Sequence, residues 1–353
     1  LAEIIKSKIF GGLPLNLSAH IWAFNEIFIK ISKYVGVFGL SFLTILWIVL
    51  LCLFFEKKKI IRVAILFVAF PLFLFSLNFL PDNKRNIYSN EVLVRIVQPN
   101  IPQKDKWNKL MFEKNFEKLI SLTTENNNIE EKKIVIWPEV ALTYFINEEE
   151  ELIEFLKTKI PKNITIVMGG LRRVFSDEKF NIYNSLYVLN DNNLIFYDKK
   201  KLVPFGEFVP FRGFLNLFKL TPGTTDFSEG SIANEIKINL NNQEVFFEPS
   251  ICYEAIFQTF GSNNSSLMIN ITNDAWFGNT VGPKQHLAAQ VFRSVEKSVY
   301  FLRSANSGIS AALDNSGKIL KKIDLNSFGY FDIKIAPSLE KTIFEKYGNV
   351  LVF

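Results

Sequence analysis

The chain has 353 residues, which exceeds the usual size of one domain and predicts two structural units. Its net charge of +5 is too small to indicate nucleic-acid binding, and its lysines and arginines are spread along the chain. Two cysteines, Cys52 and Cys252, do not suggest a disulfide framework, and with only two histidines a structural zinc site lacks ligands. We therefore expect no metal and no cofactor.

Two uncharged apolar segments near the N-terminus have the length of membrane spans, at about residues 35–55 and 63–80. Pro71 in the second segment predicts a kink, which transmembrane helices tolerate. The alternative is a pair of buried helices in a soluble core, but such helices usually carry a polar face. Between the segments lie Lys57, Lys58, Lys59 and Arg62, so the positive-inside rule puts this loop in the cytoplasm and the later chain on the outer face.

The rest of the chain divides by composition. We expect residues 1–85 to form a partial membrane domain, in which residues 21–31 form an interfacial amphipathic helix. We expect residues 86–342 to form one catalytic domain and residues 343–353 to start a further membrane helix. The chain is therefore expected to be truncated at its N-terminus and at its C-terminus.

Residues 86–342 alternate between short β-rich runs and helical patterns. Strands are predicted at residues 91–98, 133–137, 164–170, 185–189, 194–197, 245–252, 267–272 and 309–314. Helices are predicted at residues 107–125, 148–159, 255–260 and 283–298. This alternation predicts an α/β domain whose helices lie outside packed sheets.

Three segments place ionisable side chains directly after predicted strands. Cys252 ends one strand, and a strand-to-helix elbow would expose its thiol beside free backbone N–H groups; the alternative is a buried structural cysteine. Glu139 follows Trp137-Pro138 at the mouth of the sheet, although it could be an ordinary exposed loop glutamate. The lysine run 199–201 precedes the compact segment Leu202-Val203-Pro204-Phe205-Gly206-Glu207, and a solvated basic patch is its alternative.

Acyl transfer through a thioester would unite these three segments. A thiol with an ordinary pKa is mostly protonated at neutral pH, so it needs an adjacent base or cation. A glutamate in a partly apolar pocket can serve as that base. A lysine can stabilise the thiolate, and can stabilise the oxyanion together with the backbone N–H after the nucleophile. Because histidine is scarce, Glu–Lys–Cys is the catalytic set that the sequence offers.

The motifs and their order resemble the nitrilase, or carbon-nitrogen hydrolase, superfamily, and within it the apolipoprotein N-acyltransferase branch. The resemblance rests on WPE at 137–139, K-x-x-LVPFGE at 199–207, ICYE at 251–254, NDAWFG at 273–278, GP-x-QH at 282–286 and RSANSG at 303–308. The segment VQ-x-NIPQ at 97–103, followed by Trp107, fits the start of the same domain. The likeness covers roughly residues 87–352, and the two apolar segments fit the family's membrane region.

This resemblance implies a nitrilase-like α-β-β-α sandwich attached to transmembrane helices. It makes Glu139 the general base, Cys252 the acyl-accepting nucleophile and Lys199, by its spacing from PFGE, the catalytic lysine. It gives supporting roles to Glu207, which would orient the lysine, and to Tyr253 and Glu254 beside the nucleophile. It makes Trp107 and Trp276 substrate-binding residues that admit lipid; the alternative is that they are ordinary core or rim residues. His286 is expected to pack in its helix without a catalytic step.

The implied reaction transfers an acyl chain from a phospholipid, such as phosphatidylethanolamine, to the N-terminal α-amino group of diacylglyceryl-cysteine in an apolipoprotein. It would take place in the bacterial inner membrane, in a multi-pass protein whose catalytic domain lies on the periplasmic side. One alternative is a membrane-anchored amidase or hydrolase that uses the same three residues with water as acceptor. Another is a catalytically inactive interaction module.

Overall fold

The computed structural model describes residues 2–53, 60–76, 79, 91–176, 179–190, 193–209, 226–231, 235–240, 243–259, 264–336 and 341–351. In these ranges the centre of the molecule is a pair of six-stranded sheets, ordered β12-β1-β2-β3-β4-β5 and β11-β10-β9-β8-β7-β6. The strands of the first sheet are β1 (Val92–Gln98), β2 (Lys133–Ile136), β3 (Ile164–Ser176), β4 (Lys179–Asn190), β5 (Asn193–Asp198) and β12 (Gly329–Ile335). Those of the second sheet are β6 (Ile236–Leu240), β7 (Gln243–Ile251), β8 (Leu267–Thr272), β9 (Tyr300–Ala305), β10 (Ser310–Leu313) and β11 (Ile319–Ile323).

Each sheet has three parallel strands at its centre. In the first sheet β1, β2 and β3 run parallel, and in the second sheet β7, β8 and β9 do so. The remaining described pairs are antiparallel, including the long β3–β4 hairpin. Parallel strands end at the same edge of a sheet, so the segments that follow β2, β7 and β8 begin at sheet edges suited to a shared site.

The two sheets pack face to face through apolar side chains that alternate along the strands. Val94 and Ile96 of β1 lie in the same buried cluster as Phe247 of β7 and Ile269 of β8. Because both faces of these strands are covered, β1 and β8 are buried along their whole length. This packing accounts for the nearly continuous apolar runs of the sequence.

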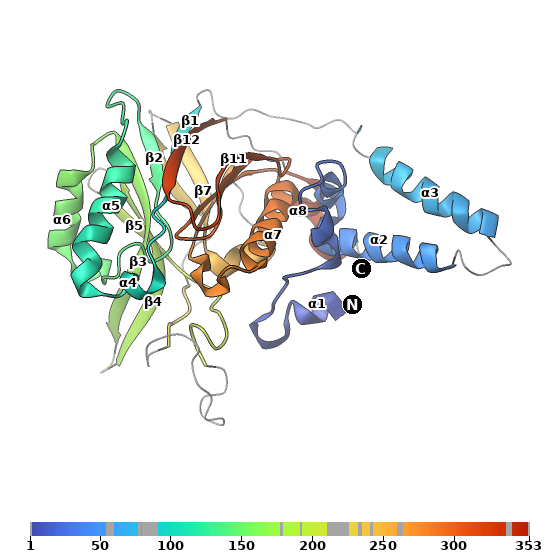
Figure 1. The fold of residues 1–353 in the computed structure, drawn as a ribbon, viewed down its shortest axis with the longest axis horizontal. Coiled ribbons are helices and arrows are strands. Elements are labelled where there is room, and N and C mark those ends of the chain that lie inside the picture. Colours follow the sequence, from blue (N-terminus) through green and yellow to red (C-terminus); the bar gives the residue numbers. More distant parts are fainter. Residues whose placement is uncertain are drawn as a thin grey trace.

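Helices cover the outer face of each sheet, as Figure 1 shows. The helices α5 (Phe112–Thr124) and α6 (Glu150–Lys159) pack on the first sheet through a cluster that includes Trp137. The helix α7 (Gly282–Lys297) packs on the second sheet, where Phe292 and Val295 share a cluster with Phe301 of β9. The predicted α-β-β-α sandwich is therefore confirmed.

The N-terminal segment covers the other side of α7. It contains α1 (Ala2–Lys6), the 3-10 turns η1 (Ile9–Gly11), η2 (Ser18–Trp22) and η3 (Ile29–Ile31), and the helices α2 (Ser32–Leu53) and α3 (Ile60–Ser76). Ala19, Val37 and Leu40 join the buried cluster of α7. The helix α2 is interrupted at Gly36 (φ 65°), where an added Cβ would lie 2.3 Å from the ring of Phe344. Phe344 belongs to α8 (Ile343–Tyr347), which the turn η9 (Gly348–Leu351) follows.

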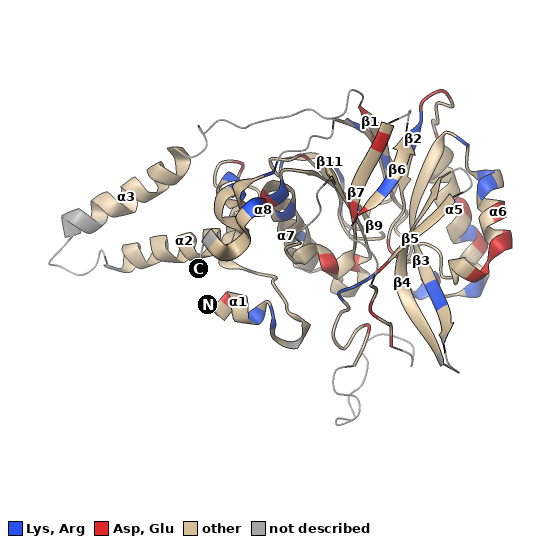
Figure 2. Cartoon of the chain, turned by 180° about the vertical axis from the view of Figure 1, so that it is seen from behind, with Lys and Arg blue, Asp and Glu red and all other residues tan. Residues whose placement is uncertain are grey.

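Beyond this junction, α2 and α3 extend away from the sandwich (Figure 1). Among the described residues, the segment Ile29–Leu50 is the one helix that is long and apolar enough to cross a membrane, and Ala64–Ser76 is a shorter apolar helix. In Figure 2 the coloured residues of α3, and those of α2 beyond the junction, are tan, whereas α5 and α6 carry blue and red residues. The basic loop at residues 57–59 and the end of the second predicted span lie outside the described residues.

Several sequence predictions differ from the structure. The helix expected at 107–125 begins only at Phe112, after the short α4 (Gln103–Lys106) and η5 (Lys109–Met111). The helix expected at 255–260 is wrong, because the turn η7 (Cys252–Ile256) starts at the cysteine itself and Phe257 is already extended. The amphipathic helix expected at 21–31 is also wrong, since η2 and η3 flank non-helical residues there. The further turns are η6 (Ile146–Glu148) and η8 (Asp274–Phe277).

The predicted strands are confirmed to within a few residues at most ends, but the sequence did not reveal β6, β9, β11 and β12. Arg303 interrupts the apolar pattern of β9, although it is fully buried and paired with Asp274. Lys321 and Lys322 give the edge strand β11 the composition of a surface loop. Of these four strands, β12 pairs with β1, which is distant in the sequence.

Candidate active site

Three loops that meet at the sheet edges each contain a residue with left-handed backbone. Cys252, directly after β7, has φ 51°; Val140, directly after Glu139, has φ 43°; and Phe205, two residues before Glu207, has φ 62°. A non-glycine residue in this region costs roughly 1–2 kcal/mol, so surrounding contacts must hold it there. Such strain is typical of functional loops, and each of the three residues either is a predicted site residue or lies within two residues of one.

Glu139, Lys199 and Glu207 form a buried charge cluster. The Lys199 ammonium lies 2.9 Å from the Glu207 carboxylate and 3.7 Å from Glu139 Oε1. Asn184 Nδ2 donates to Glu139 Oε1 at 2.8 Å and to Glu207 Oε1 at 3.1 Å. The backbone N–H of Asn273 donates to the other oxygen, Glu139 Oε2, at 2.9 Å. The lysine is therefore held between two carboxylates, and one asparagine sets their separation.

The electrostatic surroundings keep the Cys252 thiol protonated at neutral pH. Burial, together with the Glu139 carboxylate, raises the pKa of Cys252 to about 12, while Lys199 acts in the opposite direction. Burial alone would lower the pKa of Lys199, but Glu207, Glu139 and Cys252 outweigh it and raise this pKa, so the lysine remains an ammonium. A thiol with such a pKa needs a base beside it to react, and a cation to stabilise the thiolate. The cluster contains both.

Sequence reasoning missed Lys106 of α4. Its ammonium is buried and donates to the backbone carbonyl of Glu139 at 2.9 Å. Burial lowers the pKa of Lys106 to about 8, although Glu139 and Cys252 partly oppose this shift. Lys106 lies in a lysine-rich segment before Trp107. Such a segment is typical of a solvated surface, so its pattern did not predict a buried lysine. Asn184 gave no signal either, because it lies inside β4.

Glycine permits the close approach of the Glu139 loop to the sheet. A Cβ at Gly169 of β3 would lie 2.4 Å from the backbone nitrogen of Val140 and 2.7 Å from the Cα of Glu139. The loop is also fixed by backbone hydrogen bonds from Gly169 to Pro138 and from Leu142 to Gly169. The position of the carboxylate thus depends on a residue without a side chain.

Glu254 joins the cysteine loop to the lysine loop. Its Oε1 accepts hydrogen bonds from the Tyr197 hydroxyl and from the backbone N–H groups of Lys200 and Lys201, at 2.9, 2.6 and 3.1 Å. Its Oε2 accepts from the N–H of Ile251 at 2.8 Å. The neighbouring Tyr253 donates from its hydroxyl to the carbonyl of Gly12, in the N-terminal segment. Both residues are thus structural supports of the loops that carry Cys252 and Lys199.

The two tryptophans predicted to contact lipid are about half exposed. Trp107 is 50% exposed and Trp276 is 53% exposed, so neither is a core residue. Their segments are joined by a hydrogen bond of 2.9 Å from Asn273 Nδ2 to Gln103 Oε1. His286, by contrast, is buried in α7, with contacts to Asp274 and to the backbone of Cys252.

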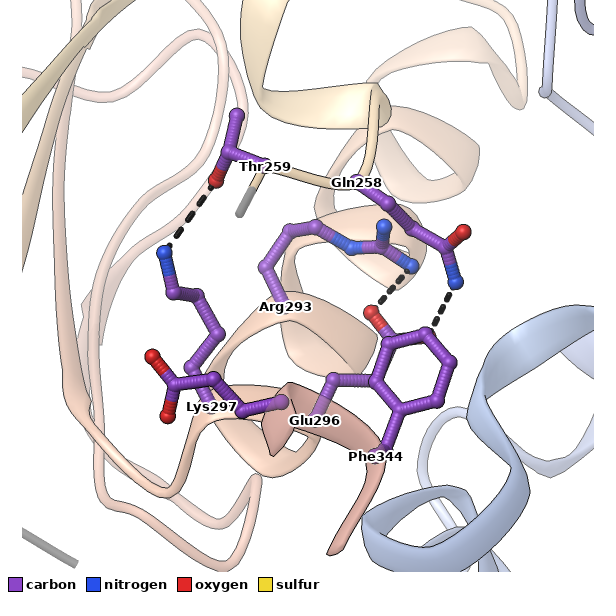
Figure 3. A pocket seen from close by; sticks show the side chains of 7 residues that line it. Gln258, Thr259, Arg293, Glu296, Lys297 and Phe344 are labelled. Carbon is purple, nitrogen blue, oxygen red and sulfur yellow. Dashed lines mark hydrogen bonds and ion pairs between the residues drawn. The ribbon is translucent and has the colours of Figure 1, made fainter. Parts of the chain in front are cut away.

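A separate cavity lies between α7, α8 and the segment after η7 (Figure 3). In it the Arg293 guanidinium pairs with Glu296 at 2.7 Å, and Gln258 donates to the same carboxylate at 2.9 Å. Glu296 also accepts from the backbone N–H of Val37, so the cavity marks the junction with α2. No predicted site residue lines it. Within the described ranges, no group of three or more His, Cys, Asp or Glu residues could hold a metal ion.

Comparisons with known proteins agree with this geometry. A family model described as carbon-nitrogen hydrolase matches residues 93–342. The chain is 35% identical over 364 residues to the apolipoprotein N-acyltransferase of Rickettsia prowazekii (strain Madrid E), covering 99% of this chain and 71% of that protein. It is also 35% identical over 367 residues to the apolipoprotein N-acyltransferase of Rickettsia bellii (strain RML369-C), covering 100% of this chain and 71% of that protein.

Among solved structures, Saccharomyces cerevisiae Nit3, a member of branch 10 of the nitrilase superfamily, matches with a TM-score of 0.47 at 18% identity. This match covers 76% of the present chain and 97% of the yeast chain. The family model and the two Rickettsia relatives carry the assignment: the chain belongs to the carbon-nitrogen hydrolase family, and within it to the apolipoprotein N-acyltransferases.

Proposed function

We propose that this protein transfers an acyl chain from a phospholipid, through a thioester on Cys252, to the N-terminal α-amino group of diacylglyceryl-cysteine in an apolipoprotein. The observation that carries the proposal is the buried Glu139–Lys199–Glu207 cluster, in which Glu139 and Lys199 act on the thiol of a cysteine held at a strand end. The names of the Rickettsia relatives support this choice of reaction.

In the first half-reaction, Glu139 accepts the proton of the Cys252 thiol as the sulfur attacks the ester carbonyl of the phospholipid. The Lys199 ammonium stabilises the developing thiolate, and with the N–H of Tyr253 it stabilises the oxyanion of the tetrahedral intermediate. When the intermediate collapses, the ester C–O bond breaks, and the lysophospholipid leaves with the proton returned by Glu139. The enzyme retains the acyl chain as a thioester.

In the second half-reaction, the α-amino group of the acceptor attacks the thioester carbonyl. Glu139 accepts a proton from the amine, the C–S bond breaks and the proton returns to the sulfur of Cys252. The amide product leaves with the acyl chain. Water must be excluded while the thioester exists, and we assign part of this role to the rim residues Trp107 and Trp276.

Both substrates are lipids, which fits a catalytic domain joined to a membrane region. We propose that residues 1–85 are that region, that its helices cross the bacterial inner membrane more than once, and that residues 343–353 start another span. The exposed apolar side chains of α2 and α3, such as Phe42, Ile48 and Phe73, suit a lipid environment. The catalytic domain would then lie on the periplasmic side.

The test uses the full chain in detergent with phosphatidylethanolamine vesicles. Intact-protein mass spectrometry should detect one acyl chain on Cys252, and a diacylglyceryl peptide should then remove it as an amide. Cys252→Ala and Glu139→Gln should form no acyl-enzyme, whereas Cys52→Ser on α2 should behave as the parent. Release of free fatty acid or ammonia without peptide acylation would instead identify a hydrolase.

A further inference from the structure

Two buried side chains lie within hydrogen-bonding distance of the Cys252 carbonyl oxygen. His286 Nε2, from α7, lies 3.2 Å from this oxygen, and Asn270 Nδ2, from β8, lies 3.4 Å from it. The exposed fraction is 2% for His286 and 0% for Asn270. These two residues come from different elements, and neither has a part in the reaction proposed above.

Both donors are themselves fixed by charge. His286 Nδ1 lies 3.0 Å from Asp274 Oδ1, and the buried Arg303 pairs with the other oxygen of the same carboxylate. Burial alone would raise the pKa of Asp274, but Arg303 and His286 outweigh this effect and hold the pKa well below its ordinary value. Arg303 Nη1 and Gln290 Nε2 donate to Asn270 Oδ1 at 3.2 and 3.1 Å. The amide of Asn270 is therefore oriented with its nitrogen toward Cys252.

The partners of His286 define its hydrogen bonds. A backbone carbonyl oxygen only accepts hydrogen bonds, so Nε2 is the donor in the contact with Cys252. Arg303 Nη2 also lies 3.4 Å from Nδ1, and the Asp274 carboxylate contacts both groups. The imidazole therefore connects a fixed carboxylate to one backbone oxygen, that of the proposed nucleophile.

The direction of this carbonyl decides the direction of the next N–H. A trans peptide unit is planar, so the carbonyl of Cys252 and the N–H of Tyr253 point to opposite sides. This peptide unit can rotate about ψ of Cys252 and φ of Tyr253, and such a rotation would turn the carbonyl and the N–H together. The hydrogen bonds from His286 and Asn270 to the carbonyl oppose that rotation.

We infer that His286 is a positioning residue which, with Asn270, holds the Cys252 carbonyl and so directs the Tyr253 N–H at the acyl carbonyl oxygen. Asp274 and Arg303 fix the imidazole for this purpose. The inference deepens the proposed thioester chemistry and rests on it, but it concerns acylation of Cys252 by any ester.

The experiment separates oxyanion stabilisation from thiol reactivity. In a Cys52→Ser background, acylation of Cys252 is followed by the burst of p-nitrophenolate from p-nitrophenyl acetate. The thiol displaces p-nitrophenolate, so a thioester forms as the ester bond breaks. Alkylation of the same thiol by iodoacetamide forms no oxyanion and reports on the nucleophile alone. The variants are His286→Leu, His286→Gln, whose side-chain nitrogen can reach the position of Nε2, and His286→Asn, which can reach only that of Nδ1.

We expect His286→Leu and His286→Asn to slow acylation by ~100- to 1000-fold, the range for loss of one oxyanion donor. Alkylation should change less than about threefold, and His286→Gln should regain acylation to within about tenfold of the parent. Ser294→Ala, a buried residue of α7 whose hydroxyl donates to its own helix at Val291, is the matched control and should match the parent. If His286→Leu does not fold, the acylation rates of His286→Gln and His286→Asn test the inference by themselves.

Three results would overturn the inference. They are acylation and alkylation that fall together, a Gln variant as slow as the Asn variant, and a folded Leu variant that acylates as fast as the parent. Failure of the proposed lipid reaction is distinguishable from these results. In that case the parent would still give the p-nitrophenolate burst but would gain no acyl chain from phosphatidylethanolamine.

Discussion

Replacement of Lys199 by methionine would remove the cation from between two buried carboxylates. The Nζ of Lys199 lies 2.9 Å from Glu207 and 3.7 Å from Glu139 Oε1. At an effective dielectric constant of about 20, these separations correspond to attractions of ~6 and ~4 kcal/mol. The cost of burying the ammonium offsets part of this attraction. Because removal of one partner leaves uncompensated buried charge, we expect Lys199→Met to lower the free energy of unfolding by about 3–5 kcal/mol.

The pH dependence follows from the raised pKa of Lys199, which Glu207, Glu139 and Cys252 produce against the opposing effect of burial. A group whose pKa is higher in the folded state contributes its full stabilisation below its unfolded pKa, about 10.4 for lysine, and loses it as the pH rises through the folded value. The difference between variant and parent should therefore be constant between pH 6 and 9. For a domain of roughly 250 residues it corresponds to ~6–20 °C in Tm.

Tryptophan fluorescence during heating in detergent measures this difference. Lys201→Met is the matched control, since Lys201 is exposed in the same segment and its loss should change the free energy of unfolding by less than about 0.5 kcal/mol. The double variant Lys199→Met/Glu207→Gln should recover about 2 kcal/mol of the loss, because one unpaired carboxylate is gone. A Lys199→Met protein as stable as the control, or a double variant less stable than the single one, would refute the reasoning.

Three further predictions concern the thiol and two glycines. Burial and Glu139 raise the pKa of Cys252 to about 12. The rate of its alkylation by iodoacetamide, in a Cys52→Ser background, should therefore rise about tenfold per pH unit between pH 7 and 10. A plateau near pH 9 would contradict this expectation. Gly169→Ala should reduce kcat by ~100-fold through displacement of Glu139, whereas Gly170→Ala, which meets only the side chains of Ile146 and Tyr187, should retain most activity; equal kcat values would count against the close-approach argument. Gly12→Ala should lower Tm more than Gly329→Ala. Both glycines have positive φ, but only a Cβ at Gly12 would meet the backbone, at 2.1 Å from the Ser7 carbonyl oxygen. Equal Tm values would contradict this prediction.

The sequence was informative where function depends on the ends of strands. Glu139, Lys199 and Cys252 each lie within three residues of the end of a strand, so their approximate places could be predicted before their contacts were known. Their catalytic roles stay predictions. The sandwich was predictable for a similar reason, since apolar runs and helical periodicity alternate along the catalytic domain.

Contacts between distant segments could not be predicted in this way. Asn184 lies 45 residues from Glu139 and 23 from Glu207, and no local pattern separates it from other polar residues in strands. Gly169 matters only because the Glu139 loop approaches it, and β12 depends on β1, whose Arg95 pairs with Asp332 across 237 residues. The helix expected after Cys252 failed because the left-handed cysteine already begins the turn.

The two-sided burial of α7 has a consequence for biogenesis. One side of this helix packs on the second sheet, while Phe292 contacts the ring of His20 and Glu296 accepts from the N–H of Val37. A newly made catalytic domain that lacks this cover would present apolar and charged groups of α7 to water. We therefore expect its folding to finish only after the N-terminal segment has packed on α7. The order of assembly would then keep Cys252 from its final position until that segment is in place.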